Sequence, residues 1–351
     1  MNKNNTLIKN VLVTGGLGYI GSHIVVELIK SNYRVIIVDN LFNSTETVLK
    51  NIKLILKKYN DSQEIINELL YFYNVDVAKQ YHLLGEIFRN HKINHVIHMA
   101  SYKSVNESIE KPIMYYKNNL NCLLNLLELM NLFNVKNLIF SSSATVYGDS
   151  EPPFIEQSKT GDGLTNPYGK TKYFCEEILR DIKDMNIYLL RYFNPIGCHE
   201  SGLIGDDPNG IPNNLMPYVL RVAIGEYDKL KVFGDDYDTR DGTPERDYIH
   251  VMDLANAHVI ALNKISNSSG VSTYNVGTGK STSVLELINI FEQVNNIHVN
   301  HEITNRRDGD VSVSYCKCDK IKSELGWEAK YSLEDMCKDS WNFIQQLNNN
   351  K

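Results

Sequence analysis

The chain has 351 residues, of which 42% are hydrophobic and 22% charged, as is ordinary for a soluble globular protein. Its formal net charge of −6 argues against a nucleic-acid partner. The longest apolar runs are too short to span a bilayer, and residues 1–10 lack the apolar core of a signal peptide. Because six scattered cysteines form neither a disulfide framework nor a metal-ligand pattern, we expect a reduced, cytoplasmic protein without a metal.

The first part of the chain, residues 1–193, alternates short β-branched runs with helical patterns. Buried parallel strands are expected at NVLVT (10–14), RVIIVD (34–39), HVIHMA (95–100), NLIFSSS (137–143) and IYLLRYF (187–193). Helices are expected between them, over 19–30, 45–59 and 112–133, and after NPYGKTK (166–172). This order predicts an α/β protein with a doubly wound, Rossmann-type parallel sheet.

The pattern changes after residue 193. A loop rich in Gly, Pro, Asn and Asp (195–214) is followed by short strands at DYIHV and TYNVG and by helices over 253–265, 284–294 and 333–347. We expect residues 194–351 to form mainly a smaller α/β lobe for the substrate, on the carboxyl-end side of the sheet. Some strands or helices are allowed to cross between the two parts.

A glycine-rich turn lies between the first strand and the first helix. The stretch VLVTGGLGYIGSH places Gly15, Gly16, Gly18 and Gly21 where a tight turn leads into a helix N-terminus. Such a turn can receive a pyrophosphate. A simple glycine-rich turn is the alternative, but the buried strand before it and the helix after it favour a dinucleotide site.

The second strand ends at Asp39, a little over twenty residues beyond the first glycines of the turn. A carboxylate at this point accepts hydrogen bonds from ribose hydroxyls and repels a 2′-phosphate. Asn40 and Leu41 follow, with no arginine to bind that phosphate, so the sequence favours NAD over NADP. Residues 1–193 are therefore expected to form mainly an NAD-binding domain. Asp76, after the next apolar stretch, is either an adenine contact or an aspartate that caps a turn.

Tyr168 and Lys172 stand four residues apart at the start of a predicted helix, so both can point at one ligand. A free tyrosine has a pKa near ~10 and is a poor base at neutral pH. A nearby ammonium and the positive nicotinamide of NAD would favour the phenolate and lower that pKa. Ser143, at the end of a strand, would hold the substrate oxygen. The alternative is an ordinary helix start, because Asn166 and Pro167 would cap any helix.

Together these motifs resemble those of the extended short-chain dehydrogenase/reductases, and most closely those of the UDP-glucose 4-epimerase family. The similarity runs nearly end to end, through TGGLGYIGSH, SSSATVYG, NPYGKTK, LLRYFNPIG, GIPNNLMPY, RDYIHVMDLA and SLEDM. An added segment around Lys57–Leu69 is the main departure in length and is expected at a surface helix.

The resemblance implies an isomerase of galactose metabolism that interconverts UDP-galactose and UDP-glucose with tightly bound NAD. In such an enzyme Tyr168 would take the proton of the sugar 4-hydroxyl while C4 passes a hydride to NAD. The 4-keto sugar would then rotate and receive the hydride on its other face. Lys172 would touch the nicotinamide ribose, and Ser143 with Thr145 would lie near the reacting oxygen.

The resemblance also implies residues for the two ligands. The implied cofactor site consists of Gly15, Gly18, Tyr19, Ile20, Gly21, Asp39, Asn40, Asp76, Val77, Met99, Ala100, Ser101, Lys103, Asn118, Ser141, Tyr168, Lys172 and Tyr192. The implied UDP-sugar site consists of Lys103, Ser143, Tyr168, Phe193, Asn194, Asn213, Asn214, Leu215, Lys231, Phe233, Arg246, Arg307, Asp310 and Ser314. Arg246 and Arg307 are candidates for the diphosphate, with surface ion pairs as the alternative.

Three other functions are alternatives to epimerisation on this fold. A nucleotide-sugar 4,6-dehydratase needs an Asp-Glu pair where this chain has Ala144-Thr145, so dehydration is disfavoured. A UDP-glucuronate decarboxylase usually carries a Glu near the same gap, and its absence argues the same way, less strongly. A non-catalytic NAD-sensing protein would tolerate loss of the Tyr/Lys pair or the strand serine, which this chain keeps.

Two finer expectations follow from the resemblance. Relatives limited to glucose and galactose carry a bulky tyrosine where this chain has Ser314, and relatives with a small residue there also epimerise UDP-GlcNAc and UDP-GalNAc. Our hypothesis is that this chain accepts both pairs. The long apolar helix over 112–133, together with the helix that NPYGKTK opens, predicts a homodimer in which both helices pack against their copies.

Overall fold

The structure is a computed structural model that describes residues 8–59, 62–307 and 309–349. The expectation about residues 1–10 therefore falls mostly outside the described residues. The added segment near Lys57–Leu69 spans the end of helix α2 (Glu46–Tyr59) and helix α3 (Gln63–Leu69), while residues 60 and 61 lie outside. Within the described ranges, no helix combines the length and the apolar character needed to cross a membrane.

Seven strands form one parallel sheet in the order β11-β6-β5-β4-β1-β2-β3. Their bounds are β1 (Asn10–Thr14), β2 (Arg34–Asp39), β3 (Leu70–Asn74), β4 (Ile93–His98), β5 (Asn137–Ser143), β6 (Asn186–Tyr192) and β11 (Gly270–Val276). The strand order reverses between β1 and β4, as in a doubly wound sheet. The predicted Rossmann-type α/β class is therefore confirmed, and the strands predicted at 10–14, 34–39 and 137–143 have the predicted bounds.

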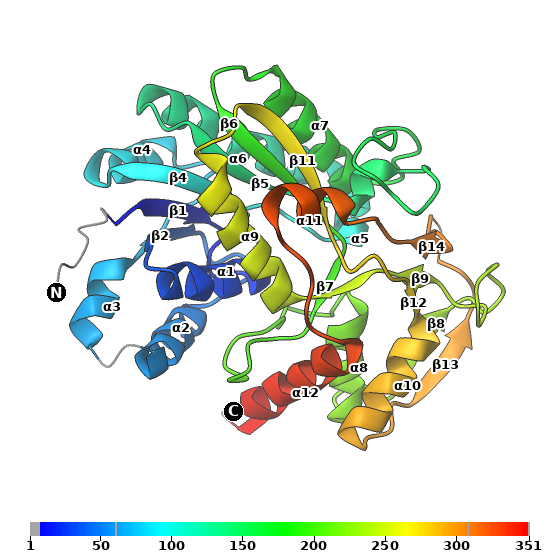
Figure 1. Cartoon of the computed structure of the whole chain (residues 1–351). Coiled ribbons are helices and arrows are strands. Elements are labelled where there is room, and N and C mark those ends of the chain that lie inside the picture. Colours follow the sequence, from blue (N-terminus) through cyan, green and yellow to red (C-terminus); the bar gives the residue numbers. More distant parts are fainter. Residues whose placement is uncertain (1–7, 60–61, 308, 350–351) are drawn as a thin grey trace.

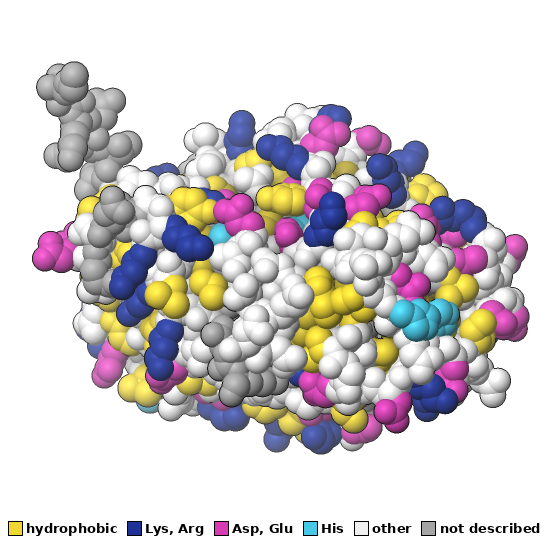
Figure 2. Space-filling view, turned by 90° about the horizontal axis from the view of Figure 1, so that it is seen from below, with side chains coloured by type: hydrophobic (Ala, Val, Ile, Leu, Met, Phe, Trp, Pro, Cys, Tyr) yellow, Lys and Arg dark blue, Asp and Glu magenta, His cyan; other side chains and the backbone are white. Residues whose placement is uncertain are grey.

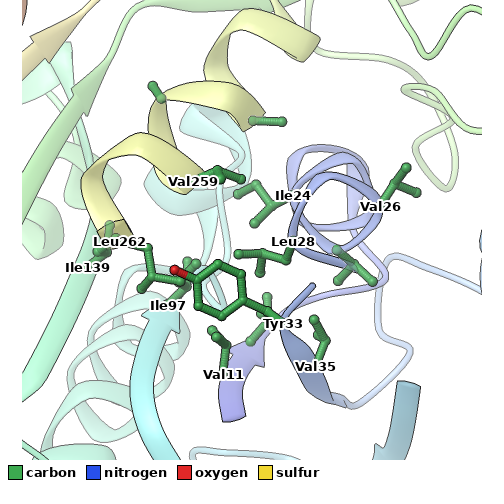
Figure 3. Packing of buried hydrophobic residues seen from close by; sticks show 14 of the residues in the cluster. Val11, Ile24, Val26, Leu28, Tyr33, Val35, Ile97, Ile139, Val259 and Leu262 are labelled. Carbon is green, nitrogen blue, oxygen red and sulfur yellow. The ribbon is translucent and has the colours of Figure 1, made fainter. Parts of the chain in front are cut away.

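Helices cover both faces of the sheet (Figure 1). One face is covered by α1 (Tyr19–Lys30), α2 and α9 (Val251–Ile265), and the other by α4 (Tyr81–Asn90), α6 (Pro112–Leu132) and α7 (Pro167–Asp181). Because side chains alternate along a strand, Val11 and Val13 pack toward α1 and α9, whereas Leu12 packs toward α4 and α6. Figure 3 shows the first of these cores, where α1 and α9 lie side by side.

Strand β11 is a point where the chain crosses between the two expected parts. Sequence reasoning places TYNVG among the short strands of the lobe, but the structure pairs it with β6 at the edge of the main sheet. Helix α9, also from the second part of the chain, packs against α1. Elements from beyond residue 193 therefore complete the half built on the seven-stranded sheet, and β11 covers the edge of the sheet that β6 would otherwise leave unpaired.

The remaining elements form a smaller lobe next to the carboxyl ends of the strands (Figure 1). Its helices are α8 (Leu215–Ala223), α10 (Val284–Asn295) and α12 (Leu333–Asn349), and they share one apolar core. Its strands pair as β8 (Leu230–Phe233) with β13 (His301–Thr304) and β7 (Asn194–Ile196) with β10 (Tyr248–His250), while β9 (Glu245–Arg246) lies between β12 (Thr282–Ser283) and β14 (Val313–Ser314) and pairs with both. On the face shown in Figure 2, acidic and basic side chains are interspersed.

Short elements complete the chain. Helix α5 (Val105–Glu110) precedes α6, the 3₁₀ turn η1 (Ala144–Tyr147) follows β5 directly, and α11 (Asp319–Leu325) packs on β11. The six cysteines are free thiols. Turn η1 matters most for the site, because it continues the strand that ends in Ser143.

Candidate active site

The predicted catalytic and cofactor residues gather at the carboxyl ends of the central strands. The glycine-rich turn follows β1, Asp39 ends β2, Met99 follows β4, Ser143 ends β5 and Tyr192 ends β6. These strands flank the position where the strand order reverses, between β1 and β4. In open α/β sheets, ligands bind in the crevice at this position.

The glycine-rich turn leaves no room for a side chain at Gly15 or at Gly21. Gly15 has a φ of +69°, and a Cβ added to it would lie 2.9 Å from the backbone nitrogen of Ala100. A Cβ on Gly21 would lie 2.2 Å from the carbonyl oxygen of Gly15. Backbone therefore packs directly on backbone here, which is the arrangement that lets a pyrophosphate approach a helix N-terminus. Tyr19 turns away and donates its hydroxyl to the Gly197 carbonyl at 2.7 Å.

Asp39 ends β2 and also stabilises the glycine-rich turn through hydrogen bonds. Its Oδ2 accepts the Leu17 amide at 3.0 Å, and its Oδ1 accepts the Leu41 amide at 2.9 Å and the Ser44 hydroxyl at 3.0 Å. A carboxylate has about four lone-pair sites, so acceptor capacity remains for a ribose hydroxyl. Asp39 thus fits the expected role and also has a structural role that the sequence does not reveal.

A cavity of about 460 Å³ lies beyond Asp39. Its lining combines an aromatic pair with polar side chains: Asn40, Phe42, Asn74, Asp76, Lys79, Gln80 and Tyr102. The rings of Phe42 and Tyr102 lie 4.5 Å apart. Asp76 accepts the Ala78 amide at 3.0 Å and pairs with Lys79 at 2.9 Å and with the Asn40 amide at 3.2 Å. Asp76 therefore caps a turn, which is one of its two predicted roles. It also lines the cavity, where a contact with adenine, the other predicted role, would lie.

Helix α7 presents Tyr168 and Lys172 as expected from their spacing. The helix begins at Pro167, and Asn166 caps it by accepting the Gly169 amide at 2.8 Å. Lys172 is buried; its Nζ donates to the Ser141 carbonyl at 2.6 Å and lies 6.0 Å from the centre of the Tyr168 ring. Burial lowers the pKa of Lys172 to about 8.

The pKa of Tyr168 differs from the expected direction. Burial raises the pKa of this phenol above its ordinary value, and a hydrogen bond with Ser143 lowers it by less. The Lys172 ammonium does not offset burial, because its nearest acceptor is the Ser141 carbonyl. Among the protein's own groups, burial therefore outweighs any lowering of the Tyr168 pKa, and the expectation that Lys172 and the positive nicotinamide of NAD lower it together stays a prediction.

Ser143 and Thr145 lie at the junction of β5 and η1. Ser143 Oγ accepts the Thr145 amide at 3.2 Å and the Thr145 hydroxyl at 3.0 Å, so the two hydroxyls form one short chain. Ser143 is only partly buried, as is Tyr168. The structure thus brings together all four predicted catalytic residues, which come from the end of β5, from turn η1 and from the start of α7.

Other predicted cofactor residues line the same region. Tyr192 is buried, and its hydroxyl lies 2.5 Å from His258 Nε2 and 3.5 Å from Met99 Sδ. The Ala100 amide donates to the Thr14 hydroxyl at 3.3 Å, and Asn118 donates to Asn119 at 3.1 Å. Lys103 pairs with Asp206 at 3.5 Å. The others are half-buried Ile20 and Ser101 and buried Val77 and Ser141.

The predicted substrate residues of the lobe cluster around β9 and β14. Arg246 forms an ion pair with Asp310, and Ser314 is paired with Arg246 across the two strands. Arg307 lies over the ring of Phe233, with its guanidinium carbon 4.4 Å from the ring centre. These two arginines are therefore engaged with other predicted substrate residues rather than with unrelated surface acids.

The rest of the predicted substrate residues lie on nearby elements. Asn214 precedes α8, and its amide reaches Asp206 at 3.5 Å, while the Asn213 amide donates to Ser104 at 3.1 Å. Leu215 begins α8. The Phe193 ring is buried, Asn194 is exposed in β7, and Lys231 lies on the same side of β8 as Phe233.

Sequence reasoning missed several polar residues that support the site. Thr14 accepts from the backbone after β4 and contacts His98 at 2.7 Å. Asn119 links the Tyr102 backbone to Thr171 of α7, at 3.1 and 2.9 Å. Glu176 lies one helical turn after Lys172, so its spacing was a usable signal; its buried partner Arg191 lies in another element, where spacing says nothing.

Comparison with known proteins decides between the family alternatives. The chain is 49% identical over 336 residues to the UDP-glucose 4-epimerase of Bacillus subtilis, and the match covers 94% of this chain and 95% of that protein. The chain belongs to the UDP-glucose 4-epimerase family. A model of the wider family, described as GDP-mannose 4,6 dehydratase, matches residues 12–340. The predicted resemblance is thereby confirmed.

Solved structures of epimerases agree with this assignment. The UDP-glucose 4-epimerase of Bifidobacterium longum, in complex with NAD+ and UDP, matches with a TM-score of 0.90 and 45% identity over 98% of this chain and 100% of that one. The epimerase of Stenotrophomonas maltophila, with bound NAD and formylated UDP-arabinopyranose, matches with a TM-score of 0.91 and 42% identity over 98% and 100%. Both relatives were therefore crystallised with NAD and a uridine nucleotide.

Proposed function

We propose that this protein is an NAD-dependent UDP-glucose 4-epimerase that interconverts UDP-galactose and UDP-glucose. The observation that carries the proposal is the convergence of Ser143, Thr145, Tyr168 and Lys172 beside a glycine turn that admits only backbone. Family membership supports the same reaction. Asp39 and the cavity behind it fit the adenosine end of NAD, and when bound NAD supplies hydride exchange at sugar C4.

Tyr168 takes the proton of the sugar 4-hydroxyl as C4 is oxidised. Burial keeps its pKa high, so the phenol needs positive charge nearby to act as a base. Ser143 orients the same oxygen, and Thr145 donates to Ser143 and fixes its hydroxyl. The flat ketone then turns about its diphosphate link, and Tyr168 returns the proton after reduction on the opposite face. The alcohol at C4 is inverted.

The first residues of η1 support epimerisation over the dehydratase and decarboxylase alternatives. Ala144 and Thr145 occupy the positions directly after Ser143, and neither carries a carboxylate. Removal of water across C5 and C6 needs an acid and a base in addition to the tyrosine. A non-catalytic NAD sensor has no need for the Ser143–Thr145 hydroxyl chain that the structure contains.

The decisive experiment measures UDP-galactose conversion by wild type and by Tyr168→Phe. Loss of the phenol oxygen removes the acid/base group, so the turnover number should fall by about 10³-fold. Binding of NAD, followed by fluorescence, should change little because the ring remains. Comparable activity of the two proteins would refute the mechanism, and no activity in wild type would refute the function.

The same site fits larger sugars. Ser314 is a small, half-buried residue on β14, next to Arg246, and an N-acetyl group needs space that a larger side chain would fill. We therefore propose that the protein also interconverts UDP-GlcNAc and UDP-GalNAc. Ser314→Tyr should retain UDP-galactose turnover and lose both N-acetyl substrates in a coupled assay. Absence of UDP-GlcNAc conversion by wild type would refute this proposal.

Helices α6 and α7 support the proposed homodimer. Ile113 and Leu124 of α6 are 65% and 43% exposed, and Phe174 of α7 is 42% exposed. Packing the two helices against their copies would remove this apolar surface from water. Size-exclusion chromatography with light scattering should give twice the mass of one chain, and a single-chain mass would contradict the proposal.

A further inference from the structure

A fully buried ion pair lies directly below the catalytic candidates. Glu176 of α7 and Arg191 of β6 are 0% and 1% exposed. Arg191 donates from Nε to Oε1 at 2.9 Å and from Nη2 to Oε2 at 2.6 Å, which is a bidentate pair. Ser142 donates to Oε1 at 2.5 Å and Arg180 to Oε2 at 2.9 Å, so each carboxylate oxygen accepts two hydrogen bonds.

The same guanidinium also contacts turn η1. Its central carbon lies 4.7 Å from the centre of the Tyr147 ring, and Nη1 donates to the Glu156 carbonyl at 3.3 Å. Tyr147 closes the turn that starts right after Ser143 and contains Thr145. Its hydroxyl donates to Asn275 of β11 at 2.5 Å. The position of the turn is therefore fixed from one side by Arg191 and from the other by β11.

The pair connects every element that carries a catalytic candidate. On α7, Glu176 lies one turn beyond Lys172 and two turns beyond Tyr168. On β5, its partner Ser142 directly precedes Ser143. On η1, Tyr147 is two residues beyond Thr145. A single pair of side chains thus sets the distance between the helix with the phenol and the strand and turn with the two hydroxyls.

Stability alone does not explain a pair in this place. Replacing a buried ion pair with apolar residues of similar size is often neutral or stabilising, because desolvating both charges is costly. Apolar contacts already hold α7 against the sheet, through Cys175 and Leu179. Ala or Leu at these positions would hold a helix there without fixing the turn that follows β5.

We infer that Glu176 and Arg191 are positioning residues, which hold the Ser143–Thr145 turn and the Tyr168 helix so that serine hydroxyl and phenol meet one sugar oxygen. This inference rests on the epimerase function proposed above. It extends that function to two residues that would touch neither substrate nor cofactor. A displacement of about 1 Å in such an arrangement can cost ~100-fold in rate.

Three variants test the inference. Arg191→Lys keeps the charge but has no planar fork to hold Glu176 and Tyr147 together. The double variant Arg191→Met with Glu176→Leu replaces the pair by apolar side chains of similar size. Arg180→Met is the matched control, since Arg180 binds the same carboxylate yet is partly exposed and contacts neither β5 nor η1.

The measurements are kcat and KM for UDP-galactose, the melting temperature, and the titration of Tyr168 by NMR of ¹³C-labelled tyrosine. Tyr168→Phe identifies the Tyr168 signal. In Arg191→Lys and in the double variant we expect kcat to fall about 30- to 100-fold with little change in KM. The Tyr168 pKa should rise, because the phenol loses its contact with Ser143. Arg180→Met should keep kcat and the Tyr168 pKa.

The double variant separates positioning from folding. If its melting temperature reaches that of wild type while kcat stays low, the pair positions the site. If the double variant has both the kcat and the melting temperature of wild type, the inference is wrong. It is also wrong if the Tyr168 pKa in Arg191→Lys equals that of wild type. Failure of the epimerase function is seen separately, as an inactive wild type, and the Tyr168 titration can be read even then.

Discussion

The half built on the seven-stranded sheet and the smaller lobe differ in how deeply some of their polar pairs are buried. In the first, the partners are buried together: Thr14 with His98, Asn119 with Thr171, and Glu176 with Arg191. In the lobe, three ion pairs are partly exposed: Arg246 with Asp310, Arg240 with Glu245, and Arg306 with Asp236. Exchanging the partner in a buried contact costs much free energy, whereas exchanging it in a partly exposed ion pair costs little.

The difference follows from the cost of desolvation. A buried polar group that loses its partner costs about 1–3 kcal/mol, so the residues around Tyr168 are held in one arrangement. An exposed ion pair contributes about 0–1 kcal/mol, so an arginine of the lobe can leave an aspartate for a phosphate at little cost. We therefore expect a rigid cofactor half and a lobe whose cations rearrange when a diphosphate binds.

The largest expected effect comes from breaking the rigid half at its glycine turn. In Gly21→Ala, the new Cβ would lie 2.2 Å from the Gly15 carbonyl oxygen, so the turn must move. The unfolding free energy should fall by about 3 kcal/mol, and NAD affinity should be lost. Urea denaturation and fluorescence titration with NAD measure these two quantities.

Gly85→Ala is the matched control for this change. Gly85 also lies within a helix, but a Cβ there would meet only a leucine methyl group at 3.4 Å. The same substitution should therefore stabilise the protein slightly, by up to about 1 kcal/mol. Equal destabilisation by both variants would show that helical glycines, rather than the close approach at Gly21, set the effect.

A smaller effect is expected from removing one cation of the lobe. Arg246→Met should raise KM for UDP-galactose about 30-fold, which corresponds to ~2 kcal/mol for a charge-assisted contact with phosphate. The melting temperature should change little, because the Asp310 pair is partly exposed. Arg306→Met is the control, since Arg306 pairs with Asp236 and covers the Tyr237 ring. A similar KM increase in the control would mean that net charge, not the position of Arg246, determines affinity.

The two parts of the molecule also show which structural features could be predicted from the sequence. Strands β1, β2 and β5 have their predicted bounds because fully buried strands are continuous β-branched runs ended by polar residues. Tyr168 and Lys172 were found because helical spacing is a local property. The sequence allows strands to cross between the two parts but does not show that β11 is the one that crosses, because its partner β6 lies far away in sequence.

Long-range contacts also limit what could be predicted of the site. The Lys172 ammonium points to the Ser141 carbonyl, and this contact depends on how α7 packs on β5. Burial then raises the Tyr168 pKa, opposite to the direction expected from a nearby lysine. Arg191 lies on the strand that follows α7, and no local pattern shows that it contacts both Glu176 and the η1 turn.

The smallest effect is expected at a buried side chain whose polar atoms, unlike those described above, lack hydrogen-bond partners within the described residues. His95 of β4 is 1% exposed, and neither ring nitrogen has a partner within the described residues. His95→Phe keeps a ring of similar shape, so it should raise the unfolding free energy by about 1 kcal/mol at pH 7.

The gain should grow as the pH falls. Burial lowers the pKa of His95 to about 4, below the ~6.5 of an unfolded histidine. Between these two values the unfolded chain binds the extra proton, so wild type loses stability from pH 6.5 downward. At pH 5 the His95→Phe variant should therefore gain a further ~2 kcal/mol over wild type. Urea denaturation at pH 7 and pH 5 measures this, and His82→Gln, on the exposed side of α4, should leave the difference between the two pH values unchanged. A gain that is the same at both pH values would mean that His95 titrates alike in the folded and unfolded chain, and that burial in this sheet does not hold it neutral.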